Sequence, residues 1–267
     1  MTGGEGHRAV AIAVASTVLF FTVLAVLITH APGWPEVKQT FFDWGQFKDS
    51  MPEIADAFLL NVKIFCIAEA FILVFALLLA IVRSLPGPAA LPLRLLGIAY
   101  ADFFRGVPTI LVIAMLGFGA PALRLNHVPL STTFWGIVAL VLVYTAYVSE
   151  VYRAGIESVH HSQAAAARSL GLTHWQSLRT VVLPQAVRRV IPPLLNDFIG
   201  LQKDTALVGF LGSVEAFKQS QIDAAATFNY TSYVAAALLF VALTIPLARF
   251  TDWLVLRDRR RRQAAGT

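Results

Sequence analysis

The sequence predicts an all-α fold: a polytopic membrane bundle of about six transmembrane helices with a helical hairpin on the cytoplasmic side. Of the 267 residues, 57% are hydrophobic and 14% are charged, whereas a soluble domain carries about 25% charged residues. The mean hydropathy is +0.67. These values exclude a water-soluble domain and a disordered tail protein. The single cysteine, Cys66, lies in an apolar run, so this chain alone forms neither an intramolecular disulfide nor a cysteine metal cluster.

Six apolar segments are long enough, or nearly so, to cross a hydrocarbon core about 30 Å thick, which needs roughly 20 helical residues. They are residues 9–29, 57–82, 95–118, 130–149, 190–211 and 230–256. Asp102, Arg105 and Pro108 interrupt the third segment, so we expect its membrane-crossing part to start closer to Val107. The first segment is longer than the apolar run of a secretory signal and no clear cleavage site follows it, so we expect it to be retained.

The placement of the basic residues explains the net charge of +5 better than an acidic partner does. With a cytoplasmic N-terminus, 15 lysines and arginines fall in inner loops and tails, and only four fall outside. The outer four are Lys38, Lys48, Arg124 and Lys218. Because basic residues resist translocation, both termini are predicted to be cytoplasmic.

The long loop between the fourth and fifth spans, residues 150–189, carries signals for two short helices. The first covers residues 163–170, which include a run of four alanines, and Gly171 follows where a left-handed residue ends a helix. Thr173 and Gln176 have the spacing of a capping box that begins the second helix. Pro184 is expected to end that helix at about Leu183.

A helix-turn-helix that binds DNA would show the same pattern at residues 166–173. Nucleic acid binding is excluded because both ends of the pair are tethered close to membrane spans. A solvated connector without a partner is disfavoured by an apolar face that needs a surface to bury against. Its residues are Leu170, Leu172, Trp175, Leu178, Val181 and Val182.

Four segments together resemble the permease subunits of polar amino-acid ABC importers, the binding-protein-dependent transport inner-membrane component family with a type I ABC transmembrane domain. Residues 163–172 with 183–186 are similar to its EAA loop, and residues 104–108 to its FRGTP segment. Residues 146–156 and 196–207 follow two further family patterns, the second similar to N-x-x-I-x-L-x-K-D-T-S-L. The resemblance covers about residues 57–255. Ala165 stands where the family's loop has a glutamate.

The resemblance implies three regions. Residues 1–56 would form an additional N-terminal transmembrane helix and an outer linker, because five spans are usual in this family. Residues 57–255 would form the permease domain, and residues 256–267 a basic cytoplasmic tail. The residues expected to couple the permease to an ATPase are Gln163, Ala165, Ala166, Gly171, Leu172, Leu183 and Pro184.

The implied function is the transmembrane permease subunit of an ATP-driven, binding-protein-dependent amino-acid importer in a bacterial inner membrane. The implied partners are an ATP-binding cassette ATPase dimer, a solute-binding protein, a second permease subunit and a polar amino acid. The sequence has no Walker A loop, so this chain is expected to bind no cofactor and to be no enzyme, with ATP and Mg²⁺ on the ATPase. Ala165 leaves a homodimer and a heterodimer both open.

An acidic outer linker contains Glu36, Asp43, Asp49, Glu53 and Asp56. Docking of the solute-binding protein and simple solubility explain it equally well.

Ionisable residues inside spans are functional candidates because burying a charge in lipid is costly. Lys203 is the strongest candidate, and Asn196 shares its helical face. Glu69 is a potential partner of Lys203, so a structural ion pair and substrate contact both stay open. Asp204 points about 100° away from Lys203 and would serve a neighbouring helix. Asn61 would line the outer mouth of the path.

Two other classes of protein are disfavoured. A stand-alone secondary transporter of small polar solutes would show inverted repeats, which are not evident in this sequence. An intramembrane enzyme would have to use His160, His161 and His174, which have no carboxylate pattern for zinc.

Overall fold

The computed structural model describes residues 3–85, 87–124, 126–159 and 161–265, and every element in these ranges is helical. The long helices are α1 (Gly3–Thr29), α3 (Trp44–Arg83), α4 (Leu91–Gly106), α5 (Thr109–Ala122), α6 (Thr132–Glu157), α9 (Leu183–Asp204) and α11 (Thr231–Ala265). The shorter elements are α2 (Trp34–Phe41), α7 (His161–Ser169), α8 (His174–Ser177), the π-helical turn η1 (Leu178–Val182), the 3₁₀ helix η2 (Thr205–Leu211) and α10 (Ala216–Thr227). The predicted all-α bundle is confirmed.

Four helical stretches in the described ranges are long and apolar enough to span a membrane: Arg8–Thr29, Trp34–Arg83, Thr132–Glu157 and Thr231–Arg257. The bent pair α4 and α5 makes a fifth if it counts as one span. The segment expected as a further span, residues 190–211, instead contains most of α9 and the whole of η2. α9 is not among the helices apolar enough to span a membrane, because it carries many polar and charged residues.

The third predicted segment is broken where the sequence suggested. The axes of α4 and α5 differ by 100° across Val107 and Pro108. Pro108 has no N–H to donate and disfavours helical geometry in the residue before it, and Val107 is accordingly extended (φ −97°, ψ 132°). The limits expected for the permease domain, residues 57 and 255, lie within α3 and α11.

α3 and α6 form the centre of the bundle, with α5, α9 and η2 packed against them. Small residues such as Ala68 on α3 and Ala139 on α6 are fully buried and allow the helices to approach closely. Gly117 of α5 and Gly136 of α6 face Leu211 and Val208 of η2 at distances that leave no room for a Cβ atom. Substitution of either glycine would therefore push η2 away from the core.

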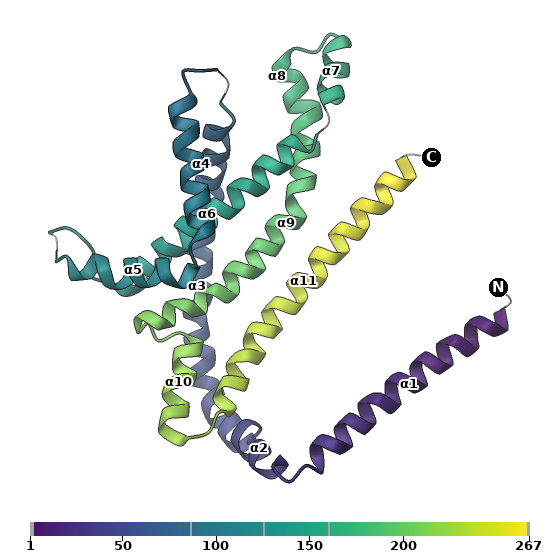
Figure 1. The fold of residues 1–267 in the computed structure, drawn as a ribbon, viewed down its shortest axis with the longest axis vertical. Coiled ribbons are helices and arrows are strands. Elements are labelled where there is room, and N and C mark those ends of the chain that lie inside the picture. Colours follow the sequence, from purple (N-terminus) through teal and green to yellow (C-terminus); the bar gives the residue numbers. More distant parts are fainter. Residues whose placement is uncertain (1–2, 86, 125, 160, 266–267) are drawn as a thin grey trace.

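A second, smaller core joins the first turns of α3 to α10 and α11. It contains Ile54, Ala216 and Ala235, and Phe58 and Phe240 meet edge to face above it with ring centroids 5.0 Å apart. This core closes the end of the molecule that holds α2 and α10 (Figure 1).

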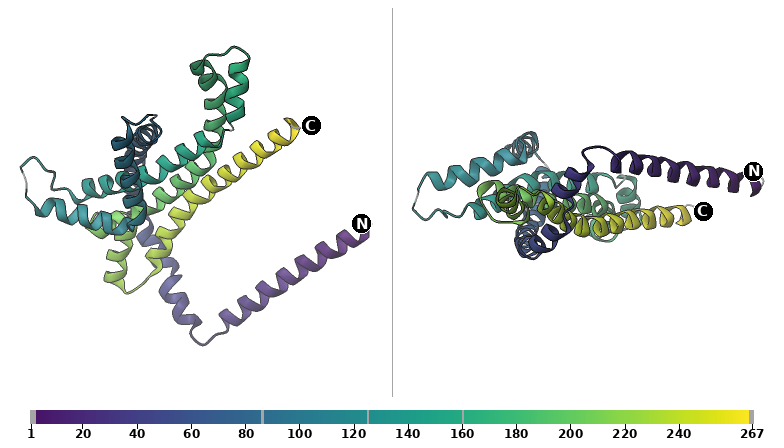
Figure 2. Two further views of the ribbon diagram at one scale, coloured as in Figure 1. Left: turned by 45° about the horizontal axis from the view of Figure 1, so that its top comes forward. Right: turned by 90° about the horizontal axis from the view of Figure 1, so that it is seen from below.

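α1 stands apart from the bundle. Every described side chain from Arg8 to Thr29 is exposed, and Figures 1 and 2 show α1 extending away on its own, on the side opposite α5. From the end with α2 and α10, α1 and α11 both extend toward the side of the molecule that carries α7 and α8, and the N- and C-termini lie at their far ends. An apolar helix of this length with no protein against it is covered by lipid or by another subunit.

Candidate coupling hairpin and translocation path

The loop between α6 and α9 forms a helical hairpin that projects beyond the bundle (Figure 1). α7 ends at Ser169, and Gly171 has φ +86°, the left-handed conformation that the sequence predicts there. The Leu172 amide donates to the Ala167 carbonyl at 3.2 Å, which closes the end of α7. The predicted glycine turn is therefore present.

The capping box at the start of the second helix is also present. The Gln176 amide donates to Thr173 Oγ1 at 3.3 Å, and the Thr173 amide donates to Gln176 Oε1 at 2.9 Å. These reciprocal hydrogen bonds satisfy two backbone donors that the start of a helix leaves free.

The predicted helix end at Pro184 is wrong. After α8 the chain passes through the π-helical turn η1, and α9 then begins at Leu183 and continues past Pro184. A proline in the first turn of a helix needs no N–H partner, so Pro184 starts α9 instead of ending the preceding helix. The hairpin is consequently continuous with α9.

Most predicted coupling residues are solvent-exposed. Leu170 is 85% exposed at the tip. Gln163, Ala165, Ala166, Gly171, Leu183 and Pro184 are exposed as well, and Leu172 is half-buried. The side chains of Trp175, Leu178 and Val182 lie outside the described part, as does all of His160. The described tip therefore offers an apolar side chain and small residues to a partner.

The base of the hairpin is fixed between α6 and α9. Gly155 of α6 lies in contact with Val190 of α9, and a Cβ atom at Gly155 would overlap the Val190 side chain. The Arg189 guanidinium of α9 donates to the carbonyl of Ser158, directly after α6. These contacts join the two helices that enter and leave the hairpin.

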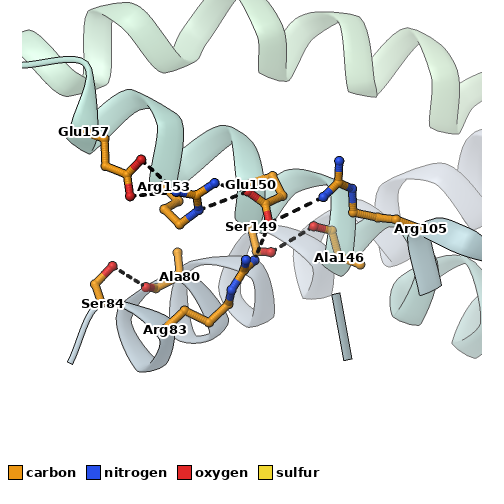
Figure 3. A network of polar contacts seen from close by, with 9 residues as sticks. All are labelled: Ala80, Arg83, Ser84, Arg105, Ala146, Ser149, Glu150, Arg153 and Glu157. Atoms are coloured by element: carbon orange, nitrogen blue, oxygen red, sulfur yellow. Dashed lines mark hydrogen bonds and ion pairs between the residues drawn. The ribbon is translucent and has the colours of Figure 1, made fainter. Parts of the chain in front are cut away.

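Beside this base, one carboxylate joins three helices (Figure 3). Glu150 of α6 pairs with Arg83 at the end of α3 (Nη1–Oε1 2.6 Å) and with Arg105 at the end of α4 (3.5 Å). Arg153, one turn later on α6, contacts Glu150 at 2.7 Å and Glu157 at 2.7 Å. We name these five residues the Glu150 network. Arg105 belongs to the motif at residues 104–108 and Glu150 to the motif at residues 146–156. The two motifs are therefore in contact in the folded protein.

Asn61, expected at the outer mouth, lies in a buried junction. Its Nδ2 donates to Thr205 Oγ1 at 3.1 Å and to Glu215 Oε2 at 2.9 Å, and its Oδ1 accepts from the Ala216 amide at 3.1 Å. Glu215 also caps α10 by accepting from the Phe217 and Lys218 amides. Burial raises the pKa of Glu215. Asn61 therefore ties α3 to η2 and α10.

The structure does not bring Lys203 and Glu69 together as an ion pair. Lys203 is exposed and lines a pocket of about 220 Å³ with Phe217, Tyr233 and Phe240. Among the ion pairs of the described residues, none includes Lys203. Asn196 is exposed like Lys203. The two residues are thus available on the outer surface of α9.

Asp204 serves a neighbouring helix, since its Oδ2 accepts from the Tyr144 hydroxyl of α6 at 2.9 Å. Tyr144 and Asp197, which lies one turn after Pro193 on α9, were not among the predicted path residues. Asp197 could have been found from sequence because it is a charged residue within a predicted span. Tyr144 carried no such signal.

Comparison with known proteins identifies the family. The family described as "Binding-protein-dependent transport system inner membrane component" matches residues 91–260. The chain is 33% identical over 204 residues to the "Probable amino-acid permease protein YxeN" of Bacillus subtilis (strain 168), covering 76% of this chain and 90% of that protein. It is 37% identical over 169 residues to the "Probable glutamine ABC transporter permease protein GlnM" of the same strain, covering 62% and 76%.

Solved structures agree. A structure titled "Crystal structure of an amino acid ABC transporter with histidines" superposes with a TM-score of 0.72 and 28% identity, over 82% of this chain and 98% of that chain. Inward-facing MetNI methionine ABC transporter, at 19% identity and a TM-score of 0.56, shares the fold over 76% of this chain and 93% of its own. The chain therefore belongs to the binding-protein-dependent transport system inner-membrane components and is a permease subunit of an ABC importer.

Proposed function

We propose that this chain forms the translocation path of an amino-acid importer and couples that path to a separate ATPase dimer, which binds the ATP and Mg²⁺. The observation that supports this most is the projecting hairpin, whose exposed tip is continuous with α9 and whose base is held between α6 and α9. The relatives named as amino-acid and glutamine permeases support the substrate class.

In this proposal, ATPase movement displaces the hairpin tip, and α9 and α6 carry that displacement into the bundle. Interfaces of packed helices change between discrete arrangements, which allows a small movement at one end to open or close a gate. The Glu150 network lies at the base of the hairpin and holds the ends of α3 and α4 to α6. It is placed to set which arrangement is favoured.

The proposed orientation puts both termini and the hairpin in the cytoplasm and the end with α2 and α10 outside. The 15 lysines and arginines of the inner loops and tails, against four outside, support it. A solute-binding protein would then dock on the outer end, where Glu53 and Asp223 both lie beside Gln219. A second permease subunit, identical or different, would complete the path.

Ala165 is exposed on α7, at the position where related loops have a glutamate. A sister subunit that retains this glutamate would supply the missing contact to the ATPase. This favours a heterodimer, and it leaves the shape of the hairpin as the contribution of this chain.

Uptake into proteoliposomes tests the proposal. The chain, co-expressed with its genomic neighbours and reconstituted with ATP inside, is expected to accumulate one labelled amino acid only when ATP and a solute-binding protein are both present. Uptake that follows a sodium or proton gradient and ignores ATP would instead support a stand-alone secondary transporter.

A further inference from the structure

In each of two carboxylates on neighbouring helices of the bundle, one buried oxygen has no hydrogen-bond partner among the described residues. Glu69 of α3 is 8% exposed, and its Oε1 accepts no hydrogen bond from any described residue. The Oδ2 atom of Asp197 on α9 is also buried, and among the described residues it too has no hydrogen-bond donor. Leaving a buried polar atom unsatisfied is costly, and leaving a charge uncompensated costs more.

The two carboxylates are carried beside one contact between α3 and α9. Phe65, one turn before Glu69, meets Phe198, the residue after Asp197, edge to face with ring centroids 6.2 Å apart. Glu69 follows Phe65 by one helical turn and Asp197 directly precedes Phe198, so both carboxylates are attached beside this aromatic contact. Each is about 14 residues from the hairpin-side end of its helix, roughly 21 Å at 1.5 Å per residue. The pair is therefore near the middle of the membrane.

The groups around the pair do not neutralise it. The Tyr144 hydroxyl of α6 donates to Asp204 and so is not available to Asp197. Within the described ranges, neither Glu69 nor Asp197 takes part in an ion pair. The protein thus holds two acidic groups together at mid-depth without supplying a basic side chain to them from its described part.

We propose that Glu69 and Asp197 form a cation-binding subsite of the translocation path, and that the transported amino acids carry a cationic side chain. This proposal rests on the proposed function and specifies its substrate class. A neutral amino acid brings one positive group and its own carboxylate, so it leaves one of the two acids without a counter-charge. Arginine and lysine each bring two positive groups, the α-ammonium and the side-chain cation, so each of the two acids can have a counter-charge.

The surroundings favour an organic cation over a metal ion. Among the described residues, no group of three or more histidine, cysteine, aspartate or glutamate side chains could hold a metal, whereas Ca²⁺ takes six to eight oxygen ligands and Mg²⁺ six. The Phe65 and Phe198 rings lie at the same contact between α3 and α9 as the two acidic residues. Aromatic faces attract ammonium and guanidinium groups, which adds to the attraction of the carboxylates.

Binding of radiolabelled L-arginine to the purified permease–ATPase complex in lipid nanodiscs, without binding protein, tests the proposal. L-Citrulline is the matched ligand because it has the shape of arginine and no side-chain charge. We expect arginine to bind at least about tenfold more tightly than citrulline, as the loss of a charge partner from a buried site implies. This comparison uses the unchanged protein and does not depend on the folding of any variant.

Variants then assign the site. Glu69→Gln and Asp197→Asn are each expected to weaken arginine binding at least about tenfold, since each removes one buried counter-charge. Glu69→Asp keeps the charge and should retain most of the binding. Asp252→Asn is the control, because Asp252 is an exposed acid on α11, 66% exposed and far from the pair along the chain. Basal ATP hydrolysis and elution volume verify that each variant is assembled.

Equal binding of arginine and citrulline would overturn the proposal, and so would unchanged arginine binding in Glu69→Gln. A third contrary result would be uptake of neutral amino acids that falls when choline replaces sodium, with this sodium dependence lost in Glu69→Gln. The site would then hold an inorganic cation. In each of these cases, ATP hydrolysis stimulated by a binding protein would still support the importer.

Discussion

Arg83, the last residue of α3, lies 2.6 Å from the carboxylate of Glu150 in the middle of the Glu150 network. The Arg83 side chain is 8% exposed and that of Glu150 is 18% exposed, so the pair is largely removed from water. Because Arg105 and Arg153 contact the same carboxylate, the removal of Glu150 leaves three guanidinium groups close together, and Glu157 is then the remaining carboxylate of the network.

Glu150→Gln is therefore expected to destabilise the protein by about 3 kcal/mol, the magnitude found when one partner of a buried ion pair is removed. Thermal unfolding in a fixed detergent measures the effect. Asp252→Asn is the matched control, because its pair with Arg249 is 66% and 80% exposed at 3.5 Å and should contribute about 1 kcal/mol or less. Equal midpoints for the two variants would show that the Glu150 network is not a structural junction.

Gly171→Val should uncouple ATP hydrolysis from uptake while the protein still inserts into the membrane. Gly171 has φ +86°, and no described atom lies within 4 Å of the place that a Cβ atom would take. The cost of valine therefore comes from the backbone alone and is about 1–3 kcal/mol. Gly171→Asn should be milder, since asparagine tolerates the left-handed region.

Gly119→Ala on α5 is the control for the glycine turn, because its backbone is not left-handed and the space around it is open. Simultaneous measurement of ATP hydrolysis and uptake in proteoliposomes separates uncoupling from loss of protein. Normal uptake by Gly171→Val would remove the coupling role of the hairpin.

Asn61→Asp should make stability strongly dependent on pH. Burial raises the pKa of Glu215 above its ordinary value of 4.5, so the native state holds a proton more readily than the unfolded chain does. The stability that this proton contributes is present at acidic pH and is lost as pH rises through the native pKa. A second carboxylate 2.9 Å from Glu215, in the place of the Asn61 amide, should make that loss steeper.

Unfolding midpoints measured over a pH series that begins below 4.5, the ordinary pKa of a glutamate, and rises from there test the effect of Asn61→Asp. Asn229→Asp serves as the comparison. The Asn229 side chain donates to the Gln39 carbonyl and accepts from the Thr231 amide, and it bonds to no carboxylate of the described residues. Parallel pH profiles for the two variants would contradict the assigned role of the junction.

Lys203→Met should reduce uptake much more than Lys63→Met does. Lys203 borders the pocket with Phe217, Tyr233 and Phe240. Lys63 is the seventh residue of the predicted span 57–82, near its outer end, and can extend to the membrane surface. Initial uptake rates at equal amounts of reconstituted protein give the comparison. Equal tolerance at both positions would exclude a functional role for Lys203.

Local features were predictable from the sequence, and contacts between distant helices were not. The turn at Gly171 and the pairing of Thr173 with Gln176 depend on neighbouring residues, and the structure has both. The break before Pro108 follows from the same local chemistry, but its 100° angle does not. The prediction for Pro184 failed because the π-helical turn η1 places this proline in the first turn of α9.

The residues predicted to line the translocation path also show that contacts between distant helices could not be predicted. Lys203 and Glu69 were considered as a pair because both lie at mid-span, yet periodicity on one helix does not reveal which face of another helix it meets. In the structure Glu69 and Asp197 lie beside the same contact between α3 and α9, and Asp204 accepts a hydrogen bond from the Tyr144 hydroxyl. The sequence identified Arg105 and Glu150 within separate motifs, and only the fold brings them to 3.5 Å.

The most direct test of the central claim, that this chain couples a separate ATPase to amino-acid import, is ATP hydrolysis by the lipid-reconstituted complex of this chain with its co-expressed genomic neighbours. The rate is measured with and without the solute-binding protein, across a panel of amino acids. We expect one ligand-loaded binding protein to stimulate hydrolysis, and Gly171→Val to separate that stimulation from uptake. If no ATPase copurifies and uptake follows an ion gradient, the claim is contradicted.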